Sequence, residues 1–154
     1  MTVRDVVVVA AGESDARVQI KKGDWSGKED GSAIFRGAWD DKNLYLCVEV
    51  SDDIHKNALT KPAYLFTADS VQFGFDLEME ASRRFSGQDH VLGLALSDAG
   101  APLAFRWVEA SRYVMKPLEA EAKVARNETT KKTVYQLALP HVYLGLKAAG
   151  GTKF

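Results

Sequence analysis

The sequence predicts an all-β fold, an antiparallel β-sandwich of two sheets with a jelly-roll or immunoglobulin-like arrangement and at most one or two short helical turns. Three observations predict it: apolar residues alternate with a period of two, the alternating segments are short, and polar turn signals separate them. The chain has 154 residues, of which 46% are hydrophobic. That length suits a single domain over residues 1–154 with a core of ordinary size.

The clearest element is a hairpin formed by residues 33–39 and 44–50. Leu44, Leu46, Val48 and Val50 share one face of the second predicted strand. The polar residues 40–43, DDKN, lie between the two strands. Their Asp and Asn side chains can bond the local backbone, which favours a turn.

The remaining elements follow at short intervals along the chain. We predict strands at 71–77, 90–96, 103–108 and 133–139, and weaker strands at 3–10, 16–21 and within 110–126. Short helical turns are expected within 57–65 and 140–146. Residues 150–154 resemble a turn that leads into another strand, so we expect either a last strand missing from this chain or an open sheet edge.

Composition argues against several classes of function. Twenty basic and 21 acidic residues give a net charge of −1, and no block of basic residues suggests binding to nucleic acid or to an anionic membrane. No apolar run approaches the roughly 18–20 residues that cross a bilayer, and the first residues lack the pattern of a signal peptide. The single cysteine, Cys47, excludes an internal disulfide. We therefore expect a soluble domain without membrane insertion.

No catalytic constellation is recognisable in the sequence. The serines do not lie in a nucleophile elbow, no glycine-rich loop has the context for binding phosphate, and the three histidines are far apart. Asp69 and Asp76 flank a predicted strand, as a pair of glycosidase carboxylates could, but solvated turn residues are the favoured interpretation. Binding is therefore a better hypothesis than catalysis.

Aspartates at the ends of predicted strands suggest a site for calcium, which binds carboxylate and loop carbonyl oxygens. The candidate ligands are Asp52, Asp53 and Asp69. No EF-hand loop is present. We therefore consider a structural calcium ion the candidate cofactor, and expect no organic cofactor.

Four segments, in this order, resemble family 9 carbohydrate-binding modules and their β-sandwich relatives. They are GAWDDKNLYL at 37–46, VEVSDDIH at 48–55, DSVQFGFD at 69–76 and YQLALP at 135–140. The resemblance covers about residues 30–145. It implies a β-sandwich that binds poly- or oligosaccharide, often with calcium. It also implies an accessory domain of a larger secreted or cell-surface protein, in an extracellular or periplasmic location.

The resemblance also indicates where a sugar would bind. The family's stacking aromatic residue, three positions before the Asp-Ser-Val motif, corresponds to Phe66, and its polar ligand on the next strand corresponds to Gln72. A second stacking residue of the family would fall beyond Phe154. Other candidates for the carbohydrate site are Trp107 with its neighbour Arg106, and Trp25 in a predicted loop.

Alternative interpretations remain open at this stage. Trp107 and Phe66 could be core residues, as we expect of Trp39, which alternates in phase with Phe35. The domain could be a structural or interaction sandwich without sugar binding. Because relatives of the fold include electron-transfer domains, haem ligation by His90 with Met79 or Met115 is a further alternative.

Overall fold

The computed structural model describes residues 2–6, 27, 29–57, 61–79, 85 and 87–145, with the backbone alone for 2–6. Its elements, in chain order, are β1 (Thr2–Val6), β2 (Ser32–Trp39), β3 (Asn43–Ser51), η1 (Pro62–Thr67), β4 (Ser70–Asp76), β5 (Asp89–Leu96), β6 (Pro102–Glu109), β7 (Arg112–Pro117), β8 (Glu121–Asn127), β9 (Lys132–Pro140) and η2 (His141–Leu144). The elements η1 and η2 are short 3₁₀ helices. The predicted all-β class is confirmed.

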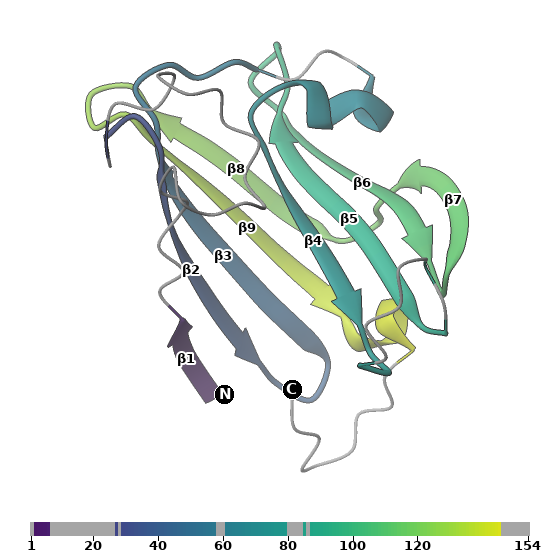
Figure 1. Cartoon of the computed structure of the whole chain (residues 1–154). Coiled ribbons are helices and arrows are strands. Elements are labelled where there is room, and N and C mark those ends of the chain that lie inside the picture. Colours follow the sequence, from purple (N-terminus) through teal and green to yellow (C-terminus); the bar gives the residue numbers. More distant parts are fainter. Residues whose placement is uncertain are drawn as a thin grey trace.

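The described strands form two antiparallel sheets that face each other as a sandwich (Figure 1). One sheet has the order β1-β2-β3-β9-β8 and the other has the order β4-β5-β6-β7. The predicted hairpin at 33–50 is formed by β2 and β3, with Leu46 opposite Gly37. The helix η1 lies in the connection between β3 and β4, where the chain passes from the first sheet to the second.

Asp40 holds the turn of the β2–β3 hairpin. Its Oδ1 accepts hydrogen bonds from the backbone N–H groups of Lys42 and Asn43, both at 2.8 Å. The Tyr45 hydroxyl donates to its Oδ2 at 2.7 Å. These three bonds favour the ionised carboxyl group, and they lower the pKa of Asp40 to about 2. The turn is therefore made by the side-chain chemistry expected of this polar segment.

The main core lies between the two sheets. Alternate residues of β3, β5 and β9 point into it, as a period of two requires. Its buried members are Leu44, Leu46, Val48, Leu92, Leu94, Leu118, Val124, Tyr135, Leu137, Leu139 and Leu144. Trp39 is partly buried against this cluster, in agreement with the expectation that it belongs to the core.

A second, smaller hydrophobic cluster lies on the other face of the four-stranded sheet. Leu65 of η1 packs there against Ala95 of β5 and Phe105 of β6. Leu65 is fully buried. The helix η1 is therefore fixed onto the outside of this sheet by its apolar residue.

Two predicted segments differ from the observed elements. The strand predicted within 110–126 is divided into β7 and β8, which belong to different sheets. Leu118, in the link between them, is buried in the main core, so the chain crosses there from one sheet to the other. The strand predicted at 16–21, and residues 7–10 of the first predicted strand, lie outside the described residues.

The described helices η1 and η2 are six and four residues long. Among the described residues, no helix has the length and apolar character needed to cross a membrane. The helix η2 lies within the region expected at 140–146, whereas η1 overlaps the region expected at 57–65 and extends two residues beyond it. Pro62 is the first residue of η1, and Pro140 comes directly before η2.

Candidate functional site

Aromatic residues gather on the outer face of the four-stranded sheet, around η1. The ring centroids of Tyr64 and Phe66 are 6.1 Å apart, and those of Phe66 and Trp107 are 6.2 Å apart. Trp107 also contacts Phe105, at 5.6 Å between centroids. Tyr64 is 54% exposed and Phe66 is 52% exposed, whereas Phe105 is buried. We call Tyr64, Phe66 and Trp107 the aromatic cluster.

A β-bulge places Trp107 in this cluster. Val91 pairs with Val108 and Leu92 pairs with Arg106, so Trp107 is the extra residue on β6. Its indole N–H donates a hydrogen bond to the backbone carbonyl of Ala63, at 3.0 Å. The bulge and this bond together join β6 to η1.

Gly93 of β5 makes room for the indole ring. A Cβ atom at this position would lie 2.9 Å from two ring atoms of Trp107 and 3.0 Å from a methyl group of Leu65. Glycine is therefore required by the close approach of two side chains, as is common for glycines within strands.

Gln72 lies next to this close contact. It pairs directly with Gly93 across β4 and β5, and its side chain is on the exposed face of β4. Phe105 pairs with Gly93 from the other side. The Gln72 amide can both donate and accept hydrogen bonds, so the same face offers exposed rings and a polar group. Gln72 on β4 and Trp107 on β6 belong to the same sheet.

The other two predicted carbohydrate residues are not brought to this face. Arg106 pairs with Leu92, a residue of the main core, and is only 4% exposed. Its guanidinium lies 2.8 Å from a carboxylate oxygen of Glu109 and 4.9 Å from the centroid of the Tyr143 ring. Trp25 lies outside the described residues. Of the predicted residues, the structure brings Phe66, Gln72 and Trp107 together.

The candidate haem ligands are differently placed. His90 is buried and pairs with Phe75, whose side chain packs against the main core. Met79 and Met115 are both exposed. An iron bound to His90 would have to lie in the packed space between the sheets. The arrangement therefore does not favour the haem alternative.

A hollow lies on the outer face of the five-stranded sheet. Its lining includes Arg36, Tyr45, Cys47, Lys123 and Gln136. The hollow is formed by β2, β3, β8 and β9, and its lining also includes alanine, leucine and glycine residues, so polar side chains surround a mostly apolar floor. One tyrosine is its only described aromatic ring, so this face offers less for stacking than the aromatic cluster does.

A group of possible metal ligands lies at the end of β3. Ligand atoms of Asp52, His55 and Asp69 are all within 4.8 Å of one another. The imidazole Nδ1 of His55 is 3.4 Å from Oδ2 of Asp69. Asp52 and Asp69 were predicted ligands, and the structure brings them together, but Asp53 is exposed and is not part of the group. His55 was not predicted as a ligand, although it ends the Asp-Asp-x-His segment.

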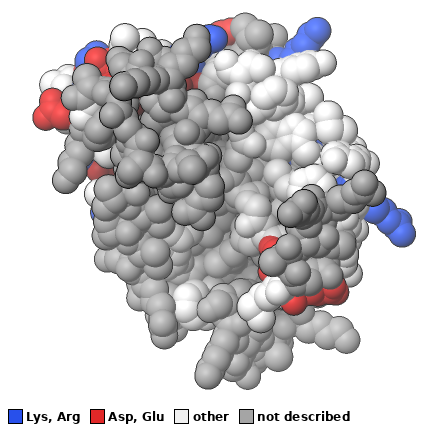
Figure 2. All heavy atoms as spheres, viewed as in Figure 1, with Lys and Arg blue, Asp and Glu red and all other residues white. Residues whose placement is uncertain are grey.

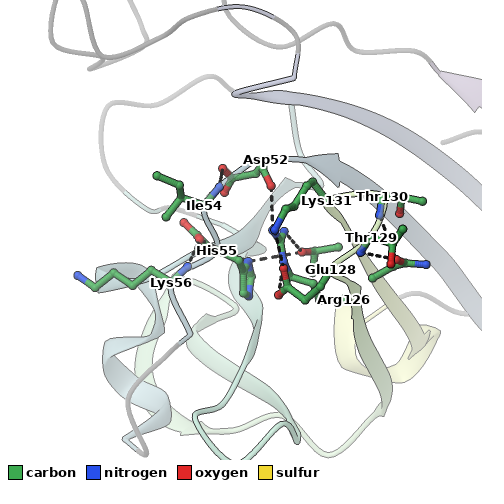
Figure 3. A network of polar contacts seen from close by, with 12 residues as sticks. Asp52, Ile54, His55, Lys56, Arg126, Glu128, Thr129, Thr130 and Lys131 are labelled. Atoms are coloured by element: carbon green, nitrogen blue, oxygen red, sulfur yellow. Dashed lines mark hydrogen bonds and ion pairs between the residues drawn. The ribbon is translucent and has the colours of Figure 1, made fainter.

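Hydrogen bonds fix the two aspartates of this group. The N–H of Asp52 donates to the carbonyl of Lys131, and the N–H of Asp69 donates to the carbonyl of Lys56. Lys56 in turn donates its own N–H to Oδ2 of Asp69. The backbone carbonyl of Asp52 accepts a hydrogen bond from Arg126 at 3.0 Å (Figure 3). These bonds join the end of β3 to the start of β4.

The two carboxylates of the group lie close together and are partly buried. Burial raises the pKa of the Asp52 carboxyl group, and the nearby charge of Asp69 raises it further. Among the described residues, neither carboxylate forms an ion pair with lysine or arginine. A divalent cation bound between the two carboxylates would offset the burial of Asp52 and its repulsion by Asp69. Calcium itself stays a prediction, since it takes six to eight oxygen ligands and this group offers two carboxylates and one imidazole.

Comparison with known proteins places the chain in a family. The searches of curated proteins and of solved structures gave no significant match. A family model described as "carbohydrate family 9 binding domain-like" matches residues 9–137. The match includes β2 to β8, most of β9, the aromatic cluster and the possible metal ligands. Because it covers most of the 154 residues, the chain belongs to the carbohydrate family 9 binding domain-like family.

Proposed function

We propose that this protein is a non-catalytic carbohydrate-binding module that holds a sugar ring against the aromatic cluster. The observation that carries the proposal is the placement of two half-exposed rings, Tyr64 and Phe66, beside Trp107 in a chain of a carbohydrate-binding family. Gln72 lies on the same face, paired with Gly93, against which the Trp107 ring packs. The surface around η1, at the upper right of Figure 2, is mainly uncharged, as stacking on a neutral sugar requires.

The chemistry of the cluster suits a glycan. The C–H faces of a sugar pack on flat rings, and Gln72 supplies hydrogen bonds to hydroxyl groups. By analogy with aromatic pairs, each stacked ring contributes about 0.5–1.5 kcal/mol. The rings are held in place before binding, because buried Leu65 and the bond from Trp107 to Ala63 fix η1. A preorganised surface loses little conformational entropy when the ligand binds.

We also propose that the domain is part of a larger protein. Family membership supports a role as an accessory domain of a larger glycan-active protein, in an extracellular or periplasmic location. The partners would then be a poly- or oligosaccharide and the other domains of that protein, with no role in binding nucleic acid. Catalysis is not part of the proposal.

A second candidate function is a structural or interaction domain that binds protein and not sugar. Exposed aromatic residues also occur away from the cluster: Phe85 and Tyr113 form an edge-to-face pair, at 5.9 Å between centroids. Tyr113 is 75% exposed. Exposed apolar residues of this kind are found at protein interfaces. The pair favours this alternative only if the aromatic cluster fails to bind glycan.

Titration with glycan oligosaccharides, followed by tryptophan fluorescence, tests the proposal. We expect a saturable change in fluorescence. Trp107→Phe should remove this change, because Trp107 is the tryptophan of the aromatic cluster, whereas Trp39→Phe should retain it. Phe66→Ala should weaken binding by about 2- to 13-fold, the ratio that corresponds to one stacked ring. Gln72→Ala should weaken binding through the loss of a polar contact.

Tyr113→Ala is the matched control, because it removes an exposed aromatic residue of the same sheet outside the cluster. It should leave the affinity unchanged. A flat response of the folded protein to a broad glycan panel would overturn the proposal and support the interaction domain. Equal loss of affinity in Phe66→Ala and Tyr113→Ala would place the binding surface elsewhere.

A further inference from the structure

The connection between β3 and β4 begins and ends at the possible metal ligands. Asp52 and His55 follow β3, and Asp69 comes directly before β4. The helix η1, with Tyr64 and Phe66, lies between them in the chain. An ion held by these three residues would therefore close the base of the segment that carries Tyr64 and Phe66 of the aromatic cluster.

His55 is the informative member of the group. Its side chain is only 4% exposed. Its Nδ1 has two neighbours, Oδ2 of Asp69 and Oγ1 of Thr133, and both are at 3.4 Å, longer than an ordinary hydrogen bond. Its Nε2 has no hydrogen-bond partner among the described residues. A buried imidazole with so few satisfied contacts requires an explanation, and a bound ion shared with the neighbouring carboxylate is one that fits its position.

The neighbouring arginine does not neutralise the group. The Nε of Arg126 donates to Glu128 at 2.9 Å, one terminal nitrogen donates to Thr133 at 3.2 Å, and the other donates to the backbone carbonyl of Asp52. Figure 3 shows these bonds around Arg126. Its charge is paired with Glu128. Arg126 thus forms no ion pair with Asp52 or Asp69, and the contact with His55 is the one that the described residues give Asp69 with a basic side chain.

The donor set indicates which ion fits. Calcium binds through oxygen, whereas imidazole nitrogen with carboxylate oxygen suits zinc and similar transition ions. Tetrahedral zinc, with ligands at about 2.0–2.1 Å, places neighbouring ligand atoms roughly 3.3 Å apart. The separation of 3.4 Å between Nδ1 of His55 and Oδ2 of Asp69 is close to that value. All three ligand atoms lie within 4.8 Å of one another, so binding one tetrahedral ion would draw the group together by up to about 1.5 Å. Water would complete the coordination.

We propose that Asp52, His55 and Asp69 bind Zn²⁺, in preference to the Ca²⁺ expected from the family, and that the ion clamps the segment carrying η1 to the ends of β3 and β4. The ion has a structural role, because it joins parts of the chain that lie 14 to 17 positions apart and shortens the free connection between them. This inference concerns a different site from the glycan site and stands without it.

Metal-stripped protein, titrated separately with Zn²⁺ and Ca²⁺, tests the inference by thermal unfolding and calorimetry. Zn²⁺ should bind with one-to-one stoichiometry. At about 100-fold excess over its dissociation constant, it should raise Tm by about 5–10 °C. Ca²⁺ at the same concentration should produce a clearly smaller shift. Binding of Co²⁺ in place of Zn²⁺ should give the visible absorption of a nitrogen- and oxygen-ligated ion.

His55→Ala should abolish the Zn²⁺ response, while Asp53→Asn, which changes the exposed neighbouring carboxylate outside the group, should retain it. If His55→Ala does not fold, the difference between the Tm shifts that Zn²⁺ and Ca²⁺ produce in the wild-type protein still tests the inference. A Ca²⁺ shift equal to or larger than the Zn²⁺ shift would overturn the inference in favour of an oxygen-ligated site. The absence of any response to Zn²⁺ would overturn it as well.

Discussion

The two faces of strand β5 serve different purposes although their residues alternate along one short segment. Leu92 and Leu94 point into the main core, where both sheets supply large aliphatic side chains. Gly93 and Ala95 point outwards, where small residues leave room for Trp107 and for η1. One face is closed by a second sheet, and the other by a single short helix that leaves two rings exposed.

This contrast between the two faces of β5 indicates which residues determine stability and which determine binding. Aliphatic residues between two sheets bury most of the apolar surface and stabilise the fold. The outer face of the four-stranded sheet buries less apolar surface, and it exposes the rings of the aromatic cluster. A substitution on the inner face should therefore change the free energy of unfolding, whereas a substitution on the outer face should change binding more than stability.

The largest expected effect comes from Leu94→Ala on the inner face. Leu94 is fully buried, and removal of its side chain should lower the free energy of unfolding by about 2–5 kcal/mol. Urea unfolding monitored by circular dichroism measures this change. Val142→Ala, at an exposed position, is the control and should change stability by less than about 0.5 kcal/mol. A loss below 1 kcal/mol for Leu94→Ala would contradict the assignment of the main core.

Gly93→Ala should have an intermediate effect. The added methyl group would clash with the Trp107 ring, which is anchored by its hydrogen bond to Ala63. We expect a loss of about 1–3 kcal/mol in urea unfolding, together with weaker glycan binding, because the ring must move. Gly74→Ala is the matched control: it lies on the same outer face, in β4, with open space around a Cβ atom. Similar losses in the two variants would show that no close contact exists at Gly93.

Phe66→Ala should change stability less than either of these. Half of its ring is already exposed to solvent, so the free energy of unfolding should fall by less than about 1 kcal/mol. Because the same variant is expected to weaken glycan binding, it separates the two properties of the outer face. If Phe66→Ala destabilises the protein as much as Leu94→Ala, the exposed ring has a structural role instead.

The smallest expected change is in the pH dependence of the free energy of unfolding, to which His90 on the inner face of β5 contributes. Burial lowers the pKa of His90 below its usual value of 6.5, against the opposing influence of Glu109. The unfolded chain therefore binds a proton more readily than the folded chain, and stability should decline as pH falls below about 6.5. His90→Gln should flatten the part of this decline that occurs between pH 6.5 and the lowered pKa. Urea unfolding at several pH values measures it, and an unchanged profile in His90→Gln would assign the decline to other groups.

Local patterns in the sequence determined much of this structure. The period of two predicted the strands of both sheets, and the DDKN segment predicted the turn that Asp40 holds by its own hydrogen bonds. The ordered segments around residues 37–76 also indicated the family that the matching model shows. These features depend on neighbouring residues, so short-range physical rules are sufficient to predict them.

Contacts between residues that are distant in the sequence depend on long-range packing. Alternation shows that Arg106 and Trp107 point to different faces, but pairing with Leu92 and the adjacent bulge decide that the arginine is buried and the indole lies against η1. The exposure of Phe66 depends on Leu65, its neighbour, taking the buried position under η1. His55 joins Asp52 and Asp69 because the two sheets bring the end of β3 to the start of β4. Local propensity determines that strands form and which residues share a face, while long-range packing determines which face is covered and by what.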